Sequence, residues 1–330
     1  VLDIVIKGPI ILFCNLEKEA VIPLKTADSI YEVPIILNSA GLLNVVTKRL
    51  NLSYSSIDLD PWMQFVEKML KAKNEIQIAL VGKYTELEDA YLSIKEALIH
   101  ASVDRKTNVK IKWVNSESLE SDDPKEVIGE VDGILLCPGF GDRGIEGKIS
   151  AVQYARVNQI PYLGDCLGMQ VLVCEFARNV AGMPDANTTE LDPNTPFPVI
   201  SLLSEQEEIE DMGGTMRLGG YDSNVVEGTL THKAYGTKKI RERHRHRYEL
   251  NNSYLEVLQK HGLVVAAKNI EDTLVEVVEI ENHPFMVGAQ FHPEFTSRPN
   301  RPNPLFRAFV EAALLFSEEK QTKKMKNESK

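Results

Sequence analysis

The chain has 330 residues, of which 43% are hydrophobic and 26% are charged, a balance typical of soluble globular proteins. Its formal net charge of −11 argues against a general affinity for nucleic acid phosphates. The four cysteines show neither a disulfide framework nor CxxC metal spacing, and no apolar run approaches the roughly 20 residues of a membrane-spanning helix. We therefore expect a cytoplasmic protein that binds neither nucleic acid nor membrane and has no metal site.

The first 58 residues contain short strand-like and helix-like segments, among them LDIVI at 2–6 and IILF at 10–13. They are too few to enclose a core of their own. We interpret residues 1–58 as the C-terminal remnant of a second α/β domain in a longer protein. Residues 59–75 are then expected to form a linker and a helix.

A regular alternation of strands and helices begins at residue 76. We expect strands at 76–82, 109–115, 133–137, 161–165, 263–267, 274–281 and 285–291, and helices near 87–101, 147–158, 168–180 and 304–316. This order predicts one α/β domain over 76–316, with a mainly parallel central sheet and helices on both faces. Ligands of such sheets bind at the carboxyl ends of the strands. Residues 317–330 are charged and are expected to form a disordered tail.

The strongest chemical motif is Gly164-Asp165-Cys166-Leu167-Gly168, which lies between a predicted strand and a predicted helix. It has the G-x-nucleophile-x-G form of a nucleophile elbow. The turn would place Cys166 at a helix N-terminus, where the helix dipole favours a thiolate. A buried cysteine in a structural turn is the alternative interpretation.

A cysteine nucleophile needs a base, and Phe291-His292-Pro293-Glu294 can supply one. Positions i and i+2 of an extended segment point to the same side. His292 can therefore face the thiol while Glu294 holds its other ring nitrogen, as in a catalytic triad. An ordinary turn at the end of a strand remains the alternative.

Three further features suit acyl transfer to Cys166 from an amino acid substrate. The Gly139 and Leu167 N–H groups are candidates for stabilising an oxyanion. The stretch 241–247 alternates arginine with glutamate and histidine, so an extended strand would place arginines on one face. Arg247 could bind an α-carboxylate bidentately, and Glu190 could bind an α-ammonium group. A solvent-exposed basic strand and a loop glutamate are the alternatives.

Taken together, these motifs resemble the class I (triad) glutamine amidotransferases, and among them the C-terminal half of the CTP synthase family. The resemblance is carried by residues 81–91, 138–148, 161–170, 185–190, 213–219, 242–250 and 288–299. Residues 10–37 resemble the end of that family's amidoligase (synthase) domain. The resemblance implies a flavodoxin-like α/β fold.

The resemblance also implies residue roles. Cys166 would attack the side-chain amide of L-glutamine, His292 would transfer the proton, and Glu294 would orient His292. The glutamine site would be formed by Gly139, Leu167, Gly168, Met169, Gln170, Glu190 and Arg247. A nucleotide contact is implied at Lys25, Thr26 and Ala27.

The family is a ligase of pyrimidine biosynthesis that aminates UTP to CTP, using ATP with Mg²⁺ and ammonia from glutamine. Its glutaminase domain needs no cofactor, GTP activates it, and the full-length enzyme is a homotetramer. The resemblance thus implies that this chain carries the glutaminase half. The alternatives are a class I amidotransferase for another acceptor and a catalytically impaired regulatory or assembly module.

Asp165 departs from the family, which usually has an apolar residue before the nucleophile. A carboxylate beside a thiolate disfavours the thiolate by Coulomb repulsion. We therefore hypothesise a less reactive thiol, unless Asp165 is protonated or paired. On this hypothesis Asp165→Ile raises glutaminase turnover.

Overall fold

The structure, a computed structural model, describes residues 2–53, 57–202 and 216–328. It divides into two compact units, Val1–Lys71 and Ala72–Lys330. The unit boundary falls within the predicted linker segment at 59–75. Residues 213–215 of the family-like segment 213–219, and residues 329–330 of the expected tail, lie outside the described residues.

The N-terminal unit is helical over its described residues. Its helices are α1 (Leu2–Cys14), α2 (Val33–Ser39), α3 (Leu42–Arg49) and α4 (Asp60–Leu70), with 3-10 helices η1 (Lys18–Ala20) and η2 (Ile30–Glu32). The segments at 2–6 and 10–13 are both helical, because α1 covers them. In the described part of this unit we find no strand, so its expected α/β character is not seen.

Helix α4 packs within the N-terminal unit and is not an isolated linker helix. The Tyr31 and Phe65 rings meet edge to face with centroids 5.2 Å apart. Trp62 Nε1 donates a hydrogen bond of 2.7 Å to the Tyr31 carbonyl. No single helix of the described chain is long and apolar enough to span a bilayer, although Ile30–Ser39 and Leu42–Arg49, bent by 66°, pass that test as a pair.

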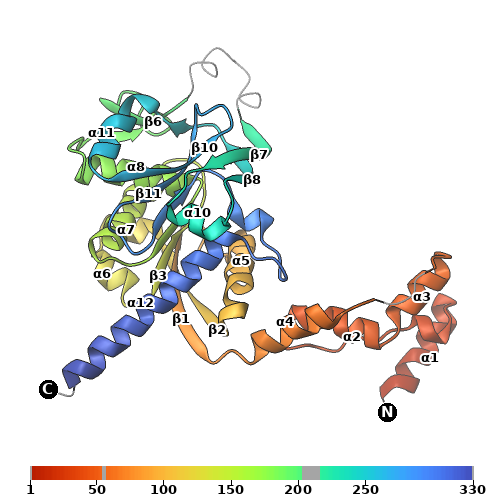
Figure 1. The fold of residues 1–330 in the computed structure, drawn as a ribbon. Helices are drawn as coiled ribbons and strands as arrows, with labels where there is room; N and C mark the ends of the chain where they lie inside the picture. Colours follow the sequence, from red (N-terminus) through yellow and green to blue (C-terminus); the bar gives the residue numbers. More distant parts are fainter. Residues whose placement is uncertain (1, 54–56, 203–215, 329–330) are drawn as a thin grey trace. The chain divides into compact units, whose positions relative to one another are not determined.

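The larger unit is built on a nine-stranded sheet (Figure 1) in the order β2-β1-β3-β4-β12-β11-β10-β7-β8. The strands are β1 (Asn74–Gly82), β2 (Thr107–Asn115), β3 (Gly133–Leu136), β4 (Tyr162–Asp165), β7 (Arg217–Val225), β8 (Lys239–His246), β10 (Leu263–Asn269), β11 (Val275–Ile280) and β12 (Met286–Ala289). The pairs from β2 to β12 are parallel. Those from β12 to β8 are antiparallel. The sheet is therefore mixed, because short turns join β10, β11 and β12 where a parallel sheet would need crossovers.

Helices cover both faces of the sheet, as predicted (Figure 1). Helices α6 (Pro124–Ile128), α7 (Ile145–Val157), α8 (Leu167–Asn179) and α11 (Leu255–Lys260) contribute to one apolar cluster, and α5 (Leu92–Ser102), α10 (Leu230–Tyr235) and α12 (Pro304–Glu328) to the other. Strand β1 shows why two layers form: Ile78 and Leu80 enter one cluster, while Ala79 and Val81 enter the other. Strands buried on both faces are typical of parallel sheets.

The remaining elements are short, apart from the long end of α12. A small sheet joins β5 (Ala186–Thr188), β6 (Phe197–Ser201) and β9 (Glu249–Leu250), and 3-10 helices lie at Glu88–Tyr91, Val103–Arg105, Ser116–Glu120, Asn252–Tyr254 and Pro293–Thr296. Helix α12 continues to Glu328. The tail expected to be disordered is therefore helical over 317–328.

The topology positions the predicted chemistry. Strands β3, β4 and β12 are neighbours and run parallel, with β4 in the middle. Their carboxyl ends lead into residues 138–141, Cys166 and residues 290–294. Three segments that are distant in sequence therefore meet at one edge of the sheet, where such folds bind ligands.

Candidate active site

Cys166 lies in the tight turn that the sequence predicts between β4 and α8. Its φ of 53° and ψ of −101° are strained for a non-glycine residue. A Cβ on Gly164 would lie 2.7 Å from the Gly168 carbonyl carbon, and one on Gly168 would lie 2.8 Å from the Leu136 carbonyl oxygen. Both glycines are thus required by close packing, and the strain presents Cys166 at the start of a helix.

His292 and Glu294 form the expected pair. His292 Nδ1 lies 2.8 Å from Glu294 Oε1, and both side chains are buried. The His292 N–H donates to the Arg243 carbonyl at 2.8 Å, and its ring stacks on Phe295 with centroids 5.0 Å apart. Within the described chain His292 Nε2 makes no hydrogen bond of good geometry, but the ring lies close enough to Cys166 for the two side chains to interact. The ring is therefore fixed at one nitrogen and available at the other.

The electrostatics tie His292 to Cys166. Burial lowers the pKa of His292, but hydrogen bonding to Cys166 and Glu294 and the negative charge of these groups outweigh this effect and raise the pKa to about 11. An imidazole that keeps its proton at neutral pH can act as a general acid towards a group bound at Cys166. The sulfur also contacts the Arg245 carbonyl at 3.8 Å.

A small pocket opens at the thiol. Its lining residues are Gly139, Phe140, Cys166, Leu167, Gln170, Glu190, His246, Arg247 and Tyr248. Five of the seven residues predicted to contact glutamine are among them, together with the nucleophile. Gly168 and Met169 do not line the pocket. Leu167 and Gln170 are three positions apart in α8 and share the helix face at the pocket, whereas the two residues between them point elsewhere. Met169 is fully buried against Gly288 in the core instead.

The pocket carries charges of both signs. Arg247 Nε is buried without a hydrogen-bond acceptor among the described residues. Glu190 Oε1 accepts a long hydrogen bond of 3.5 Å from the Gly141 N–H. A free guanidinium edge and a carboxylate in one pocket are complementary to an α-carboxylate and an α-ammonium group.

The sequence analysis missed several residues at this site. Phe140, His246 and Tyr248 line the pocket, and each adjoins a residue that was predicted. Gln290 is fully buried, and its Nε2 lies 3.9 Å from Cys166 Sγ. Gln170 Nε2 donates to Gln290 Oε1 at 3.3 Å. Gln290 lies in the segment 288–299 that carries the resemblance, but its contact with Cys166 arises from the pairing of β4 with β12 and was not predicted.

The two predicted oxyanion donors are free. Neither the Gly139 nor the Leu167 N–H donates a hydrogen bond to any described residue. Leu167 follows the nucleophile at the N-terminus of α8, and Gly139 lies in the turn after β3. Both N–H groups belong to residues that line the pocket, as is required of donors to an oxyanion formed there.

Asp165 is fully buried, and neither carboxylate oxygen has a hydrogen-bond partner in the described structure. Burial, with the Glu294 carboxylate, raises its pKa well above the usual range. Both observations favour the protonated form of Asp165, and a protonated Asp165 would not repel a thiolate at Cys166. We now expect Asp165→Ile to change turnover little, within about threefold, since no charge is removed.

Asp165→Ile is expected to stabilise the protein, and both Asp165→Ile and Asp165→Asn are expected to reduce the dependence of its stability on pH. Removing a buried unpaired carboxyl contributes about 1–3 kcal/mol in the isoleucine variant. Because the folded-state pKa is raised, the wild-type free energy of unfolding falls as pH rises from about 4 towards that pKa. Urea titrations across this range should show that slope in wild type and less of it in both variants. An isoleucine variant less stable than wild type at pH 8 would contradict this account.

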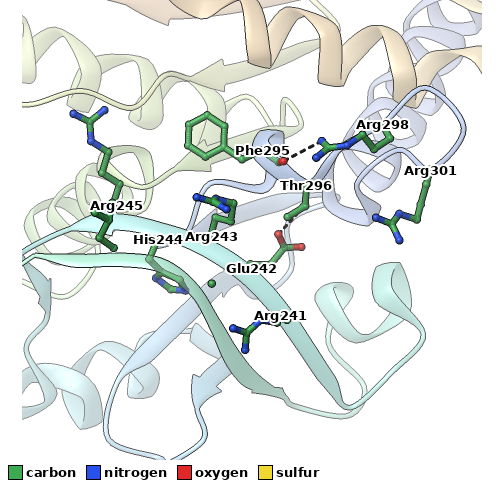
Figure 2. Close-up of a pocket in the computed structure, with 11 residues that line it drawn as sticks. Arg241, Glu242, Arg243, His244, Arg245, Phe295, Thr296, Arg298 and Arg301 are labelled. Carbon is green, nitrogen blue, oxygen red and sulfur yellow. Dashed lines mark hydrogen bonds between the residues drawn. The ribbon is translucent and has the colours of Figure 1, made fainter. Parts of the chain in front are cut away.

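A larger cavity of about 710 Å³ lies beside the active site and is lined by arginines. Figure 2 shows Arg241, Arg243 and Arg245 from β8, with Arg298 and Arg301 from the segment after Thr296. Strand β8 alternates as predicted, with Arg241, Arg243 and Arg245 exposed and Glu242, His244 and His246 buried. Arg247, in contrast, lies beyond the strand and lines the small pocket.

Two other predictions concern nucleotides and metals. Lys25, Thr26 and Ala27 lie in the N-terminal unit, between η1 and η2, in a segment without helix or strand. Their nucleotide contact stays a prediction. In the part of the chain that the structure describes, no group of three or more His, Cys, Asp or Glu side chains is arranged to hold a metal ion.

Comparison with known proteins agrees with this geometry. Residues 86–312 match the family model of the class I glutamine amidotransferases. CTP synthases from Methanocaldococcus jannaschii and Carboxydothermus hydrogenoformans are 52% and 53% identical to this chain, over 94% and 92% of it. The chain spans 58% and 57% of the length of these two relatives.

A solved structure extends the match to three dimensions. The glutaminase domain of Trypanosoma brucei CTPS with bound acivicin is 38% identical, with a TM-score of 0.68. The match covers 72% of this chain and 93% of that domain. The chain therefore belongs to the class I glutamine amidotransferases, in the branch that contains the CTP synthases.

Proposed function

We propose that the site hydrolyses glutamine to glutamate and ammonia through a γ-glutamyl thioester on Cys166. The observation that supports this most is that the turn at 139–140 and the elbow residues Cys166 and Leu167 line one pocket, while the His292–Glu294 pair interacts with Cys166. Nucleophile, base and orienting carboxylate are the elements of covalent acyl transfer. The pocket also holds charges for both ends of an amino acid.

The steps follow from the geometry. The Cys166 thiolate attacks the carboxamide carbon, and the Gly139 and Leu167 N–H groups stabilise the oxyanion. The protonated His292 gives its proton to the departing nitrogen, so ammonia leaves and the thioester forms. His292 then accepts a proton from water, which attacks the thioester and releases glutamate. Glu294 keeps the imidazole oriented throughout.

The test is to incubate the chain with L-glutamine and measure both products. We expect ammonia and glutamate in equal amounts, with asparagine a poor substrate because its shorter side chain cannot span from Arg247 to Cys166. Folded protein without turnover would favour the alternative of a regulatory or assembly module. Equal turnover of asparagine would contradict the role of the pocket.

Arg247→Ala is expected to raise KM for glutamine about 100-fold, since a charge-assisted pair contributes about 1.5–3 kcal/mol. The kcat should change much less, because the α-carboxylate is remote from the reacting carbon. Arg247→Lys keeps the charge but not the fork, so an intermediate KM is expected. Steady-state kinetics of the three proteins provide the check. A large fall in kcat with KM unchanged would assign Arg247 another role.

In the complete enzyme we propose that the ammonia aminates UTP to CTP, with ATP and Mg²⁺ bound in the rest of the protein and Lys25–Ala27 contributing to the nucleotide site. The arginine-lined cavity offers guanidinium groups for an anion such as the activator GTP. Assembly as a homotetramer and a cytoplasmic location belong to the same proposal. The free cysteines, Cys14 exposed and Cys137, Cys166 and Cys174 buried, suit a reducing compartment.

A further inference from the structure

Lys148 is a buried lysine that the mechanism above does not use. It lies in the first turns of α7, and its side chain is 0% exposed. Its Nζ donates one hydrogen bond, of 3.3 Å, to the Cys137 carbonyl. Among the described residues the ammonium has no other acceptor and no ion-pair partner. A buried charge with so little compensation is energetically unfavourable, so its location requires a reason.

The surroundings of Lys148 supply that reason. A Cβ built on Gly139 would lie 3.8 Å from Lys148 Nζ. The ammonium is thus adjacent to the residue whose N–H is a candidate oxyanion donor. Burial lowers the pKa of Lys148 to about 8, although the Cys137 and Cys166 thiols oppose this effect. At neutral pH the side chain therefore still carries its charge, close to where negative charge develops.

A second lysine holds the other end of the same turn. Lys83, which is 8% exposed and follows β1, donates from Nζ to the carbonyls of Phe140 and Gly141, the latter at 3.1 Å. The Phe140 carbonyl and the Gly141 N–H belong to the same peptide group, and this N–H points to Glu190. The N–H and C=O groups of a planar trans peptide point in opposite directions. Fixing the Phe140 carbonyl on the lysine side therefore directs the Gly141 amide hydrogen towards Glu190, which lines the pocket.

We propose that Lys148 and Lys83 are positioning residues that clamp the turn at 137–141 from both ends, so that the Gly139 N–H is aimed at the anion formed when Cys166 attacks its substrate. Lys148 holds the carbonyl before Pro138, and Lys83 holds the carbonyls after Gly139. The peptide between them then has little freedom to rotate. Lys148 adds a fixed positive charge behind the donor, where the low dielectric makes it effective.

The test compares Lys148→Met with wild type, and it rests on the proposed glutaminase function. Methionine has a similar length but neither charge nor donors. We expect kcat for glutamine to fall about 10- to 100-fold with KM within about threefold, because a misdirected oxyanion donor affects the transition state more than substrate binding. The melting temperature should stay the same or rise, since a buried charge is replaced by an apolar group.

A second readout separates positioning from general damage. Alkylation of Cys166 by iodoacetamide forms an S–C bond and releases iodide, without a tetrahedral oxyanion. Its rate should therefore change by less than about threefold in Lys148→Met. The matched control is Lys112→Met, since Lys112 Nζ also donates to a carbonyl, that of Ile128 at 2.9 Å, but on the edge strand β2. The control should keep wild-type kcat.

An unchanged kcat in Lys148→Met would overturn the proposal. A fall in the rate of Cys166 alkylation as large as the fall in kcat would also overturn it, because the damage would then not be specific to the oxyanion. Wild-type protein without turnover would refute the glutaminase function instead. In that case a crystal structure of Lys148→Met can still test whether Lys148 orients the turn, because this test does not require an active enzyme. We expect the Gly139 N–H to turn away from Cys166 in that structure, and an unmoved turn would overturn the clamp.

Discussion

Cys166→Ala is expected to reduce glutamine hydrolysis by about 10⁴- to 10⁶-fold, because the nucleophile of a catalytic triad acts as a unit with its base. Without sulfur there is no thioester, and water must attack a resonance-stabilised amide directly. The pocket keeps Arg247 and Glu190, so glutamine should still bind. Product release measured by coupled assay, together with calorimetric titration of glutamine, distinguishes lost chemistry from lost binding.

Cys174→Ala is the matched control for that experiment. Like Cys166, Cys174 is a buried free thiol, but it lies within α8 in the apolar core, and burial raises its pKa to about 12. Its replacement should leave kcat unchanged while lowering stability slightly. Loss of turnover in Cys174→Ala with an active Cys166→Ala variant would reverse the assignment of the nucleophile.

His292→Ala is expected to lower kcat by about 10²- to 10⁴-fold, the usual contribution of general acid–base catalysis. The raised pKa of His292 provides an imidazolium that can protonate the leaving nitrogen, and its positive charge beside Cys166 favours attack by the sulfur. Alkylation of Cys166 by iodoacetamide should therefore slow as well, unlike in the Lys148 variant. Stopped-time assays of turnover and alkylation on the same preparation provide the measurement.

The control is His261→Ala. His261 follows α11, is exposed, and contacts the Val257 carbonyl through Nδ1 at 2.8 Å. Turnover in this variant should equal that of wild type. If His292→Ala kept wild-type kcat, the imidazole would be a structural group and another base would have to be found.

The catalytic groups could be predicted from sequence because each lies in a short motif. Two glycines around Cys166 already indicate a tight turn, and a two-residue spacing already indicates that His292 and Glu294 share a side. Contacts across the sheet could not be predicted in this way. Gln290 reaches Cys166 only because β12 lies beside β4, and Lys148 reaches the Gly139 turn only because α7 packs directly behind it.

The fold was predictable to a similar degree. Alternating strands and helices indicate the parallel half of the sheet, but the hairpins of the second half depend on pairings that residue patterns do not specify. The apolar segment at 2–6 looks like a strand because isoleucine and valine favour strands, yet it lies in α1. Local propensity is a weak guide where the surrounding contacts decide.

The central claim is that the sulfur of Cys166 reacts at the carboxamide position of bound glutamine. It is tested most directly with a chloroketone analogue of glutamine, followed by intact-mass measurement and peptide mapping. The account predicts one adduct per chain, located on Cys166, prevented by excess glutamine and absent from Cys166→Ala. A thiol that stays unmodified in folded protein, or an adduct on the exposed Cys14 that glutamine does not prevent, would contradict it.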